Sequence, residues 1–206
     1  MINENKDHWY DGWFYDKFIA PSQDKLFQQI KNLIEPNSKI IDVGCGTGRF
    51  SFSVTDKCKD VLGIDLSSRN IDRANLTLSE NPNNKISFQH KSVGEIIFAG
   101  QEHFNYAVLT YVVHEVNIDE RVKLLKEITR VADKIIIGDY LVPKPNCFGS
   151  MLNEVIEFAA GSQHYRNYKS YVANGGMYDL ANKAGLKIIT EIKNQPSTSH
   201  IVMLTE

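Results

Sequence analysis

The sequence predicts an α/β protein, with a doubly wound, seven-stranded and mostly parallel sheet whose last strand is antiparallel. Short runs of branched apolar residues alternate with segments of helical periodicity along most of the chain. A glycine-rich turn follows the first run, where open α/β sheets bind ligands. The last two runs are joined by a short connection, Asn194–Ser199, which permits a hairpin but not a parallel crossover.

The strand predictions rest on short runs rich in branched apolar residues, as expected for strands buried on both faces of a parallel sheet. The first and most distinct run has the sequence KIIDV. Strands are predicted at Lys39–Val43, Val61–Ile64, Ile86–Gln89, Tyr106–Thr110, Lys134–Asp139, Leu186–Ile192 and His200–Leu204.

Amphipathic segments fill the intervals between these runs. In the first of them, Leu26, Ile30 and Leu33 recur at helical spacing and predict one buried face. Ser67 is a candidate N-cap for a further helix. Helices are predicted at Gln23–Ile34, Arg49–Asp56, Ser67–Ser79, Asp119–Ala132, Met151–Ala160 and Gly176–Ala184.

Length and composition predict one globular domain over residues 1–206. Of the 206 residues, 42% are hydrophobic and 23% are charged, so the chain can bury a core. The net charge of −2 argues against a protein that coats nucleic acid or an anionic membrane. We therefore expect no nucleic-acid partner and no membrane insertion, in a monomer or homodimer. The densest basic group is predicted to be a solvated helix face, formed by Arg121, Lys123, Lys126 and Arg130.

The cysteines and the N-terminal sequence predict the cellular compartment of the protein. Cys45, Cys58 and Cys147 are widely spaced and form no CxxC pair, so neither a disulfide scaffold nor a zinc finger is expected. Free thiols are typical of a reducing compartment. The N-terminal stretch MINENKDHWYDGWFYD lacks the apolar core of a secretory signal, and no apolar run approaches the roughly 20 residues that span a bilayer. We expect a soluble, cytoplasmic protein.

Two aromatic-rich segments flank the predicted sheet. Residues 1–38 are expected to form an N-terminal helical cover, and residues 143–175 a helical insert that also covers the substrate site. For most of the individual aromatic side chains, packing in the core is the simpler interpretation. The aromatic residues concerned are Trp9, Tyr10, Trp13, Phe14, Tyr15, Phe18, Phe148, Phe158, Tyr165, Tyr168 and Tyr171.

The most informative segment is IIDVGCGTGRF, residues 40–50. A buried strand ends before Gly44, and the chain turns on Gly44, Gly46 and Gly48 before a helix begins. Glycine is needed where the backbone lies against a ligand without a Cβ between them. Asp65 ends the second strand, where a carboxylate can accept hydrogen bonds from ribose hydroxyls. The combination predicts a nucleoside-binding site; a ligand-free tight turn with Asp65 as a helix cap is the alternative.

The motifs IIDVGCGTGRF and VLGIDLS resemble those of class I S-adenosylmethionine-dependent methyltransferases, of the small-molecule, ubiquinone/menaquinone-type branch. The resemblance extends over most of the chain, through FNYAVLTYVVHEV, IIIGDYLVP and GGMYDLANKAGLKII. It implies the Rossmann-like methyltransferase fold, S-adenosyl-L-methionine as cofactor, and direct in-line methyl transfer to a small-molecule acceptor. The glycine pattern is GxGxG, whereas dinucleotide enzymes use GxGxxG.

The resemblance also implies roles for individual residues in cofactor binding. Asp42 corresponds to the acid that orients the amino group of the cofactor. Gly44, Cys45 and Gly46 correspond to the loop that passes beneath its methionine part. Asp65 corresponds to the acid that binds the ribose hydroxyls.

Further residues correspond to the adenine and methionine contacts. Leu66 is expected to pack on the adenine, and Ser92 and Val93 to hold it, although Ser92 stands where the family often has an acid. Thr110 falls where the backbone meets the methionine moiety. Tyr15, together with Tyr10 and Trp13, is a candidate to face the sulfonium by cation–π attraction.

Methyl transfer from a sulfonium requires no metal in principle, and no metal is predicted. His114-Glu115 is an isolated pair along the sequence, and HExxH is absent. His114, Asp139 and His164 are candidates for a general base, because they follow predicted strands or lie in the insert. A backbone-bonded histidine or a satisfied strand-end acid is the structural alternative for each. The sequence does not identify the acceptor.

Two other functions are compatible with a glycine loop on such a sheet. A nicotinamide-dependent oxidoreductase is disfavoured by the glycine spacing. A non-catalytic domain would keep S-adenosylmethionine as a structural or regulatory ligand and would show binding without turnover.

Overall fold

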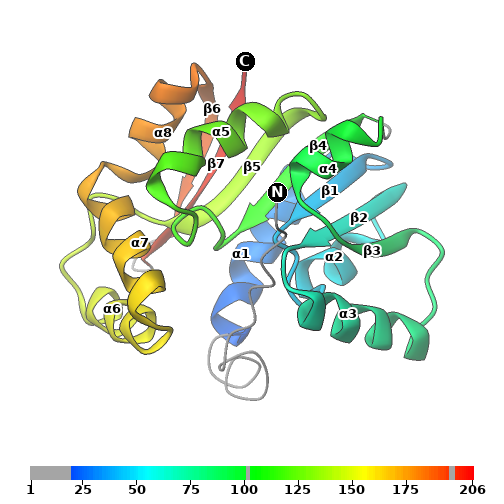
Figure 1. The fold of residues 1–206 in the computed structure, drawn as a ribbon, viewed down its shortest axis with the longest axis horizontal. Helices are drawn as coiled ribbons and strands as arrows, with labels where there is room; N and C mark the ends of the chain where they lie inside the picture. The colour runs from blue at the N-terminus through cyan, green and yellow to red at the C-terminus, as the bar shows by residue number, and fades with distance from the viewer. Residues whose placement is uncertain (1–19, 101–102, 195–197) are drawn as a thin grey trace.

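The computed structural model describes residues 20–100, 103–194 and 198–206, with side chains from residue 23 onward. Helices and strands alternate along the chain as far as residue 140, and three successive helices then precede the last two strands (Figure 1). The helices are α1 (Ala20–Leu33), α2 (Arg49–Val54), α3 (Ser68–Glu80), α4 (Val93–Phe98), α5 (Ile118–Ile128), α6 (Phe148–Ala159), α7 (Ser162–Ala173) and α8 (Gly176–Ala184). The strands are β1 (Lys39–Val43), β2 (Asp60–Asp65), β3 (Ile86–His90), β4 (Phe104–Thr110), β5 (Ala132–Tyr140), β6 (Lys187–Lys193) and β7 (Ser199–Thr205).

The seven strands form one sheet in the order β3-β2-β1-β4-β5-β7-β6. Strands β1 to β5 pair in parallel, and β7 lies antiparallel between β5 and β6. The predicted fold class, including the antiparallel last strand, is confirmed. The strand order reverses between β1 and β4, so the usual ligand crevice of an open α/β sheet lies at their carboxyl ends.

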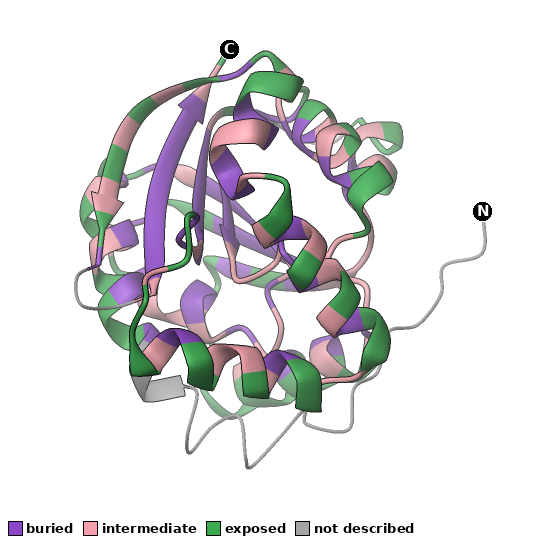
Figure 2. Cartoon of the chain, turned by 90° about the vertical axis from the view of Figure 1, so that its left-hand side faces the viewer, coloured by how far each residue is buried: buried purple, intermediate pink, exposed green. Residues whose placement is uncertain are grey.

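The sheet is buried on both faces, which divides the core into two clusters. Alternate residues of β1, Ile41 and Val43, share one cluster with α4, α5 and α8. Ile40, from the opposite face of β1, joins the other cluster with α1, α2 and α3. Figure 2 shows the central strands as buried and the helices with exposed outer faces. The branched apolar runs of β1, β4, β5 and β7 are therefore covered from both sides, whereas the edge strand β6 has no buried residue.

The predicted strands all form, with bounds that differ by at most two residues. Two helices were not predicted. α4 has six residues, which is too short for a periodic pattern to emerge. α7 buries His164, Tyr168 and Tyr171 at helical spacing, so its inner face is made of polar-tipped rings rather than aliphatic side chains.

The segment between β5 and α8 extends from the sheet and contains α6 and α7. Figure 1 shows these two helices at one end of the molecule, beyond the helices that flank the sheet. Within the described residues, no helix has the length and apolar character needed to cross a membrane.

Candidate active site

The glycine loop between β1 and α2 has backbone conformations that glycine adopts more readily than other residues. Gly44 has a φ of 73° and Gly46 a φ of 55°, both in the left-handed region. A Cβ on Gly44 would lie 2.5 Å from Val112 Cγ2, whereas a Cβ on Gly46 would meet nothing within 4 Å. Gly44 therefore packs the loop against the segment that follows β4, and Gly46 borders open space that can admit a ligand.

Asp65, at the end of β2, holds this loop from the side. Its Oδ2 accepts a hydrogen bond from the backbone N of Gly46 at 2.8 Å, and its Oδ1 accepts one from the backbone N of Ser67 at 2.7 Å. A carboxylate oxygen can accept more than one hydrogen bond. Asp65 therefore stabilises the turn before α3 and also lies beside the open space at Gly46, so its structural role does not exclude the predicted contact with ribose.

Asp42, on β1, is fully buried. Its Oδ2 accepts a hydrogen bond from Ser51 Oγ at 2.5 Å, but Oδ1 has no hydrogen-bond partner among the described residues. Burial raises the pKa of Asp42 from 3.8 to about 7, although the Ser51 hydrogen bond opposes the rise. A buried carboxylate oxygen without a partner is the kind of acceptor that the amino group of the predicted cofactor requires.

The remaining loop and strand-end candidates lie close by in the fold. Cys45 is buried, and burial raises the pKa of its thiol well above the ordinary value, so it is not a thiolate nucleophile. Leu66 and Thr110 are half-buried at the carboxyl ends of β2 and β4. Tyr15 lies outside the described residues, as do Tyr10 and Trp13.

Ser92 and Val93 lie just after β3, on the other side of β2 from the glycine loop. Ser92 is the N-cap of α4: its Oγ accepts from the backbone N of Glu95 at 3.3 Å and donates to Glu95 Oε2 at 2.9 Å. Val93 is buried in the core. The resemblance assigns Ser92 to the adenine alone, whereas its hydroxyl also completes a capping box. The adenine contact stays a prediction.

A buried histidine–carboxylate pair lies at the carboxyl ends of β4 and β5. His114, in the loop after β4, and Asp139, near the end of β5, are both almost fully buried. His114 Nδ1 lies 2.7 Å from Asp139 Oδ1, and the backbone N of His114 donates to Asp139 Oδ2 at 3.1 Å. The two contacts fix the ring, with Nδ1 on the carboxylate and Nε2 left for other partners.

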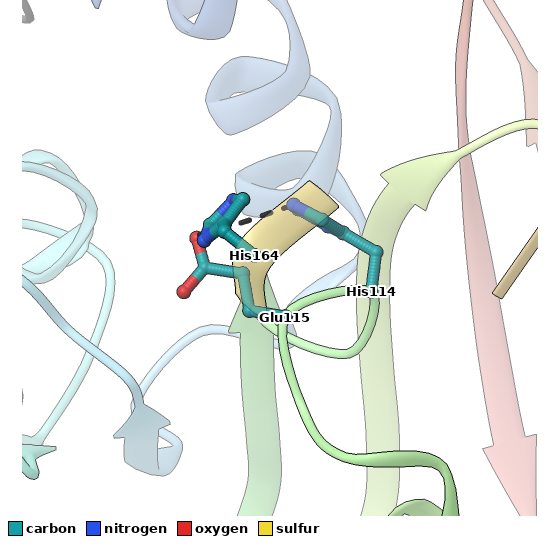
Figure 3. Close-up of side chains that lie close together, drawn as sticks. All are labelled: His114, Glu115 and His164. Carbon is teal, nitrogen blue, oxygen red and sulfur yellow. Dashed lines mark ion pairs between the residues drawn. The ribbon is translucent and has the colours of Figure 1, made fainter. Parts of the chain in front are cut away.

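His164, from α7, meets this pair through Glu157 of α6. His164 Nε2 lies 2.6 Å from Glu157 Oε2, and His114 Nε2 lies 3.5 Å from Glu157 Oε1. Glu115 Oε1 is 3.6 Å from His164 Nε2 and 4.0 Å from His114 Nε2. Figure 3 shows the side chains of His114, Glu115 and His164 converging. The fold thus brings together all three predicted general-base candidates, His114, Asp139 and His164. These three residues, together with Glu115 and Glu157, form a group that we call the His–Glu cluster.

The charges of the His–Glu cluster stabilise one another. Burial alone would lower the pKa of His114, but Asp139 and Glu157 outweigh it and hold that pKa well above the usual range. Burial alone would raise the pKa of Glu157, but His114 and His164 hold it well below its usual range. At neutral pH the ligand-free cluster therefore pairs a protonated His114 with the Glu157 carboxylate.

Tyrosine rings line the His–Glu cluster. The Tyr140 ring lies 4.7 Å from the His114 ring, and its hydroxyl donates to Glu157 Oε1 at 2.7 Å. The rings of Tyr168 and Tyr111 lie 5.3 and 5.6 Å from that of Tyr140. Tyr111 has a φ of 58°, a conformation that non-glycine residues rarely adopt and that is concentrated at functional sites.

Arg121 ties α7 to the loop that carries His114. Its guanidinium donates to the backbone O of Asn167 at 2.6 Å and, through Nε, to the backbone O of Val116 at 2.9 Å. Asn167 Nδ2 donates to the backbone O of Glu115 at 2.6 Å. The prediction of a solvated face was wrong for Arg121, which is buried, because the docking of α7 removes it from water.

Sequence reasoning missed Glu157, Glu115 and Arg121 as parts of this site. Glu157 sits on a helix whose other side chains gave no functional signal, and Glu115 was set aside as half of an isolated pair. The partners of Glu115 lie at sequence separations that no local motif covers, since His164 is on α7. The capping box of Ser92 and Glu95 was the one local signal that could have located α4.

Comparisons with known proteins find the same fold and a family match that includes the glycine loop. Residues 40–134 match the family model described as a methyltransferase domain. The O-antigen chain terminator bifunctional methyltransferase/kinase WbdD of Escherichia coli is 30% identical over 134 residues, which cover 61% of this chain and 19% of that protein. The chain therefore aligns with about a fifth of the length of this curated relative.

Two solved structures share the whole architecture at low sequence identity. Magnesium protoporphyrin IX methyltransferase (ChlM) from Synechocystis PCC 6803, with bound S-adenosylhomocysteine, is 16% identical with a TM-score of 0.67, over 96% of this chain and 90% of that one. The N-methyltransferase NodS from Bradyrhizobium japonicum WM9, in complex with S-adenosylhomocysteine, is 12% identical with a TM-score of 0.65, over 95% and 92%.

The match over residues 40–134 is to a methyltransferase domain, and the fold is similar to that of S-adenosylmethionine-dependent methyltransferases. The Synechocystis magnesium protoporphyrin IX methyltransferase has also been solved with bound S-adenosylmethionine. Open space at Gly46 and the unpartnered Oδ1 of Asp42 are features of this chain that fit that cofactor.

Proposed function

We propose that this chain transfers the methyl group of S-adenosylmethionine to a small-molecule acceptor that binds beside the His–Glu cluster. The observation that carries the proposal is the position of that cluster. His114 and Asp139 lie at the carboxyl ends of β4 and β5, and the loop that carries His114 packs on Gly44 through Val112. The acceptor and the cofactor loop would thus be neighbours, as direct transfer requires.

The cofactor would be held by the residues around the glycine loop. When bound, S-adenosylmethionine supplies a methyl group on a sulfonium, which is already activated toward a nucleophile. Asp42 Oδ1 would accept from its amino group, and Asp65 would accept from its ribose hydroxyls. The other residues proposed to contact it are Gly44, Cys45, Gly46, Leu66, Ser92, Val93, Thr110 and Tyr15.

His114, Asp139 and His164 are proposed to act on the acceptor. Asp139 fixes the His114 ring through Nδ1, and His164 approaches from α7. Because His114 is protonated in the ligand-free cluster, the cluster must release that proton before it can accept another. Since the groups are strongly coupled, we assign uptake of the acceptor's proton to the cluster as a unit. A hydroxyl acceptor needs such help more than a thiolate or an unprotonated amine does.

The acceptor is proposed to be a partly apolar small molecule, as in the ubiquinone/menaquinone-type branch. The tyrosines that line the cluster, among them Tyr140 and Tyr168, offer apolar ring faces with hydroxyl groups at their edges. Similar proteins include a magnesium protoporphyrin IX methyltransferase and an N-methyltransferase, which supports a small-molecule acceptor without selecting its reacting atom.

The two covers belong to this proposal. In residues 143–175, α6 supplies Glu157 and α7 supplies His164, so the insert completes the proposed acceptor site. In residues 1–38, α1 packs on the sheet, whereas residues 1–19 lie outside the described part of the chain. We propose that both segments exclude water from the acceptor during transfer.

The test is formation of S-adenosylhomocysteine from S-adenosylmethionine with a panel of acceptors: quinone precursors, amines, sugars, fatty acids and thiols. We expect turnover with one class and a loss of about 100-fold or more in the Asp139→Asn variant. The control is His103→Asn, a surface histidine paired with Asp133 and remote from the site. Binding of S-adenosylhomocysteine without turnover on the whole panel would instead support a non-catalytic cofactor-binding domain.

A further inference from the structure

We propose that His114, His164 and Glu115 form a binding site for one divalent first-row transition-metal ion of the Zn²⁺ type, with the Glu157 carboxylate nearby as a fourth donor group. Their donor atoms come from the loop after β4 and from α7, and all lie within 4.8 Å of one another. Figure 3 shows the three side chains converging on one point. No local motif indicates this site, because His164 is remote from the His114-Glu115 pair along the chain.

The distances fit a metal ion without large movements. Zinc bonds of about 2.0–2.2 Å to nitrogen and oxygen place neighbouring tetrahedral donors about 3.4 Å apart. Glu115 Oε1 lies 3.6 Å from His164 Nε2 and 4.0 Å from His114 Nε2, and Glu157 Oε1 lies 3.5 Å from His114 Nε2. The 2.6 Å ion pair of Glu157 Oε2 with His164 Nε2 must open, because the ion takes its place on that nitrogen.

The groups behind the donors are those that metal sites use. Metal-bound histidines usually give their second ring nitrogen to a carboxylate or carbonyl, which fixes the ring and raises its basicity. Asp139 Oδ1 holds His114 Nδ1 in this way at 2.7 Å. Tyr140 likewise orients Glu157 through a 2.7 Å hydrogen bond. The outer contacts therefore pre-organise Nε2 of His114 toward the ion.

Charge and ligand type select the class of ion. Asp139, Glu115 and Glu157 bring three carboxyl groups to a largely buried site, and buried charges need compensation. Binding of the ion displaces the extra proton of His114, so that the ion takes over the compensation of the carboxylates. Two neutral imidazoles with a carboxylate suit zinc, iron(II) and related ions, whereas magnesium prefers oxygen ligands alone. The Glu115 side chain is 43% exposed, which gives the ion a route from solvent.

The site bears on the proposed methyl transfer but does not depend on it. With an ion bound, His114 is a ligand, and the acceptor oxygen would lose its proton through polarisation by the metal. Without one, the cluster keeps the proton-accepting role proposed above. Metal binding is therefore measured alone, so that its failure leaves the methyltransferase proposal standing.

The experiment uses the full chain, stripped with a chelator and titrated with Zn²⁺ and, for spectroscopy, with Co²⁺. We expect one equivalent to bind, with a visible Co²⁺ spectrum of nitrogen and oxygen ligation. Glu115→Gln and His164→Asn should weaken binding at least tenfold, and Asp139→Asn, which removes the outer contact, about 10–100-fold. His103→Asn should bind as the wild type does, and Mg²⁺ should not compete.

Two outcomes would overturn the proposal. One is the absence of stoichiometric Zn²⁺ and Co²⁺ binding in protein that circular dichroism shows to be folded. The other is binding that Glu115→Gln leaves unchanged. Because 43% of the Glu115 side chain is exposed, that variant keeps the test valid even if His164→Asn fails to fold.

Discussion

Replacing Gly46 by alanine separates backbone strain from obstruction of the cofactor. At a φ of 55°, a non-glycine residue costs about 1–2 kcal/mol. For a domain of this size, that lowers Tm by about 2–8 °C. The added Cβ meets no protein atom within 4 Å and instead enters the space assigned to the cofactor. Binding of S-adenosylhomocysteine should therefore weaken at least about tenfold, or 1.4 kcal/mol, beyond any loss of folded protein.

Gly185→Ala is the matched control for this prediction. Gly185 has a φ of 75°, and a Cβ there also meets nothing within 4 Å, but it lies at the end of α8. Both variants should lose similar stability in thermal unfolding without ligand, and only Gly46→Ala should lose affinity in calorimetric titration. Equal affinities in the two variants would refute the placement of the cofactor at Gly46.

Three further substitutions test separate contacts. Asp65→Ala should weaken S-adenosylhomocysteine binding by about 2–4 kcal/mol in calorimetry, since it removes a charged acceptor; an unchanged affinity would leave Asp65 as a turn-stabilising residue only. The pKa of Asp42 is about 7 in the folded protein, compared with the ordinary value of 3.8. Ionisation of this buried carboxyl therefore lowers the free energy of unfolding of the ligand-free protein as the pH rises from about 4 to about 7. The loss is at most about 4 kcal/mol. Urea unfolding of Asp42→Asn should lack that decline, and a parallel decline in both proteins would contradict the assigned pKa. Arg121→Met should lower the free energy of unfolding by about 2–4 kcal/mol, because the backbone oxygens of Val116 and Asn167 lose their donors; a change within 0.5 kcal/mol would show that water replaces the guanidinium.

The sheet and the cofactor loop were predictable because their signals are local. Branched apolar runs predicted all seven strands, and the short Asn194–Ser199 connection required the last pair to be antiparallel. The spacing of Gly44 and Gly46 after a strand, with Asp65 after the next strand, located the loop. Each of these patterns lies within a few residues or follows from the period of a regular element.

The His–Glu cluster was predictable only in part. The ends of predicted strands singled out His114 and Asp139, but nothing in the sequence set their distance or placed His164 beside them. That placement depends on α7, whose docking uses Arg121 and Asn167. Tertiary contacts of this kind have no local signature, which is why Glu157 was missed.

A crystal structure of the complex with S-adenosylhomocysteine tests most directly whether the glycine loop and the His–Glu cluster form two halves of one active site. We expect the amino group on Asp42 Oδ1, the ribose hydroxyls on Asp65, and the sulfur directed from the loop toward the side of His114 Nε2. A ligand bound with its sulfur facing away from His114, or bound elsewhere on the chain, would contradict the account.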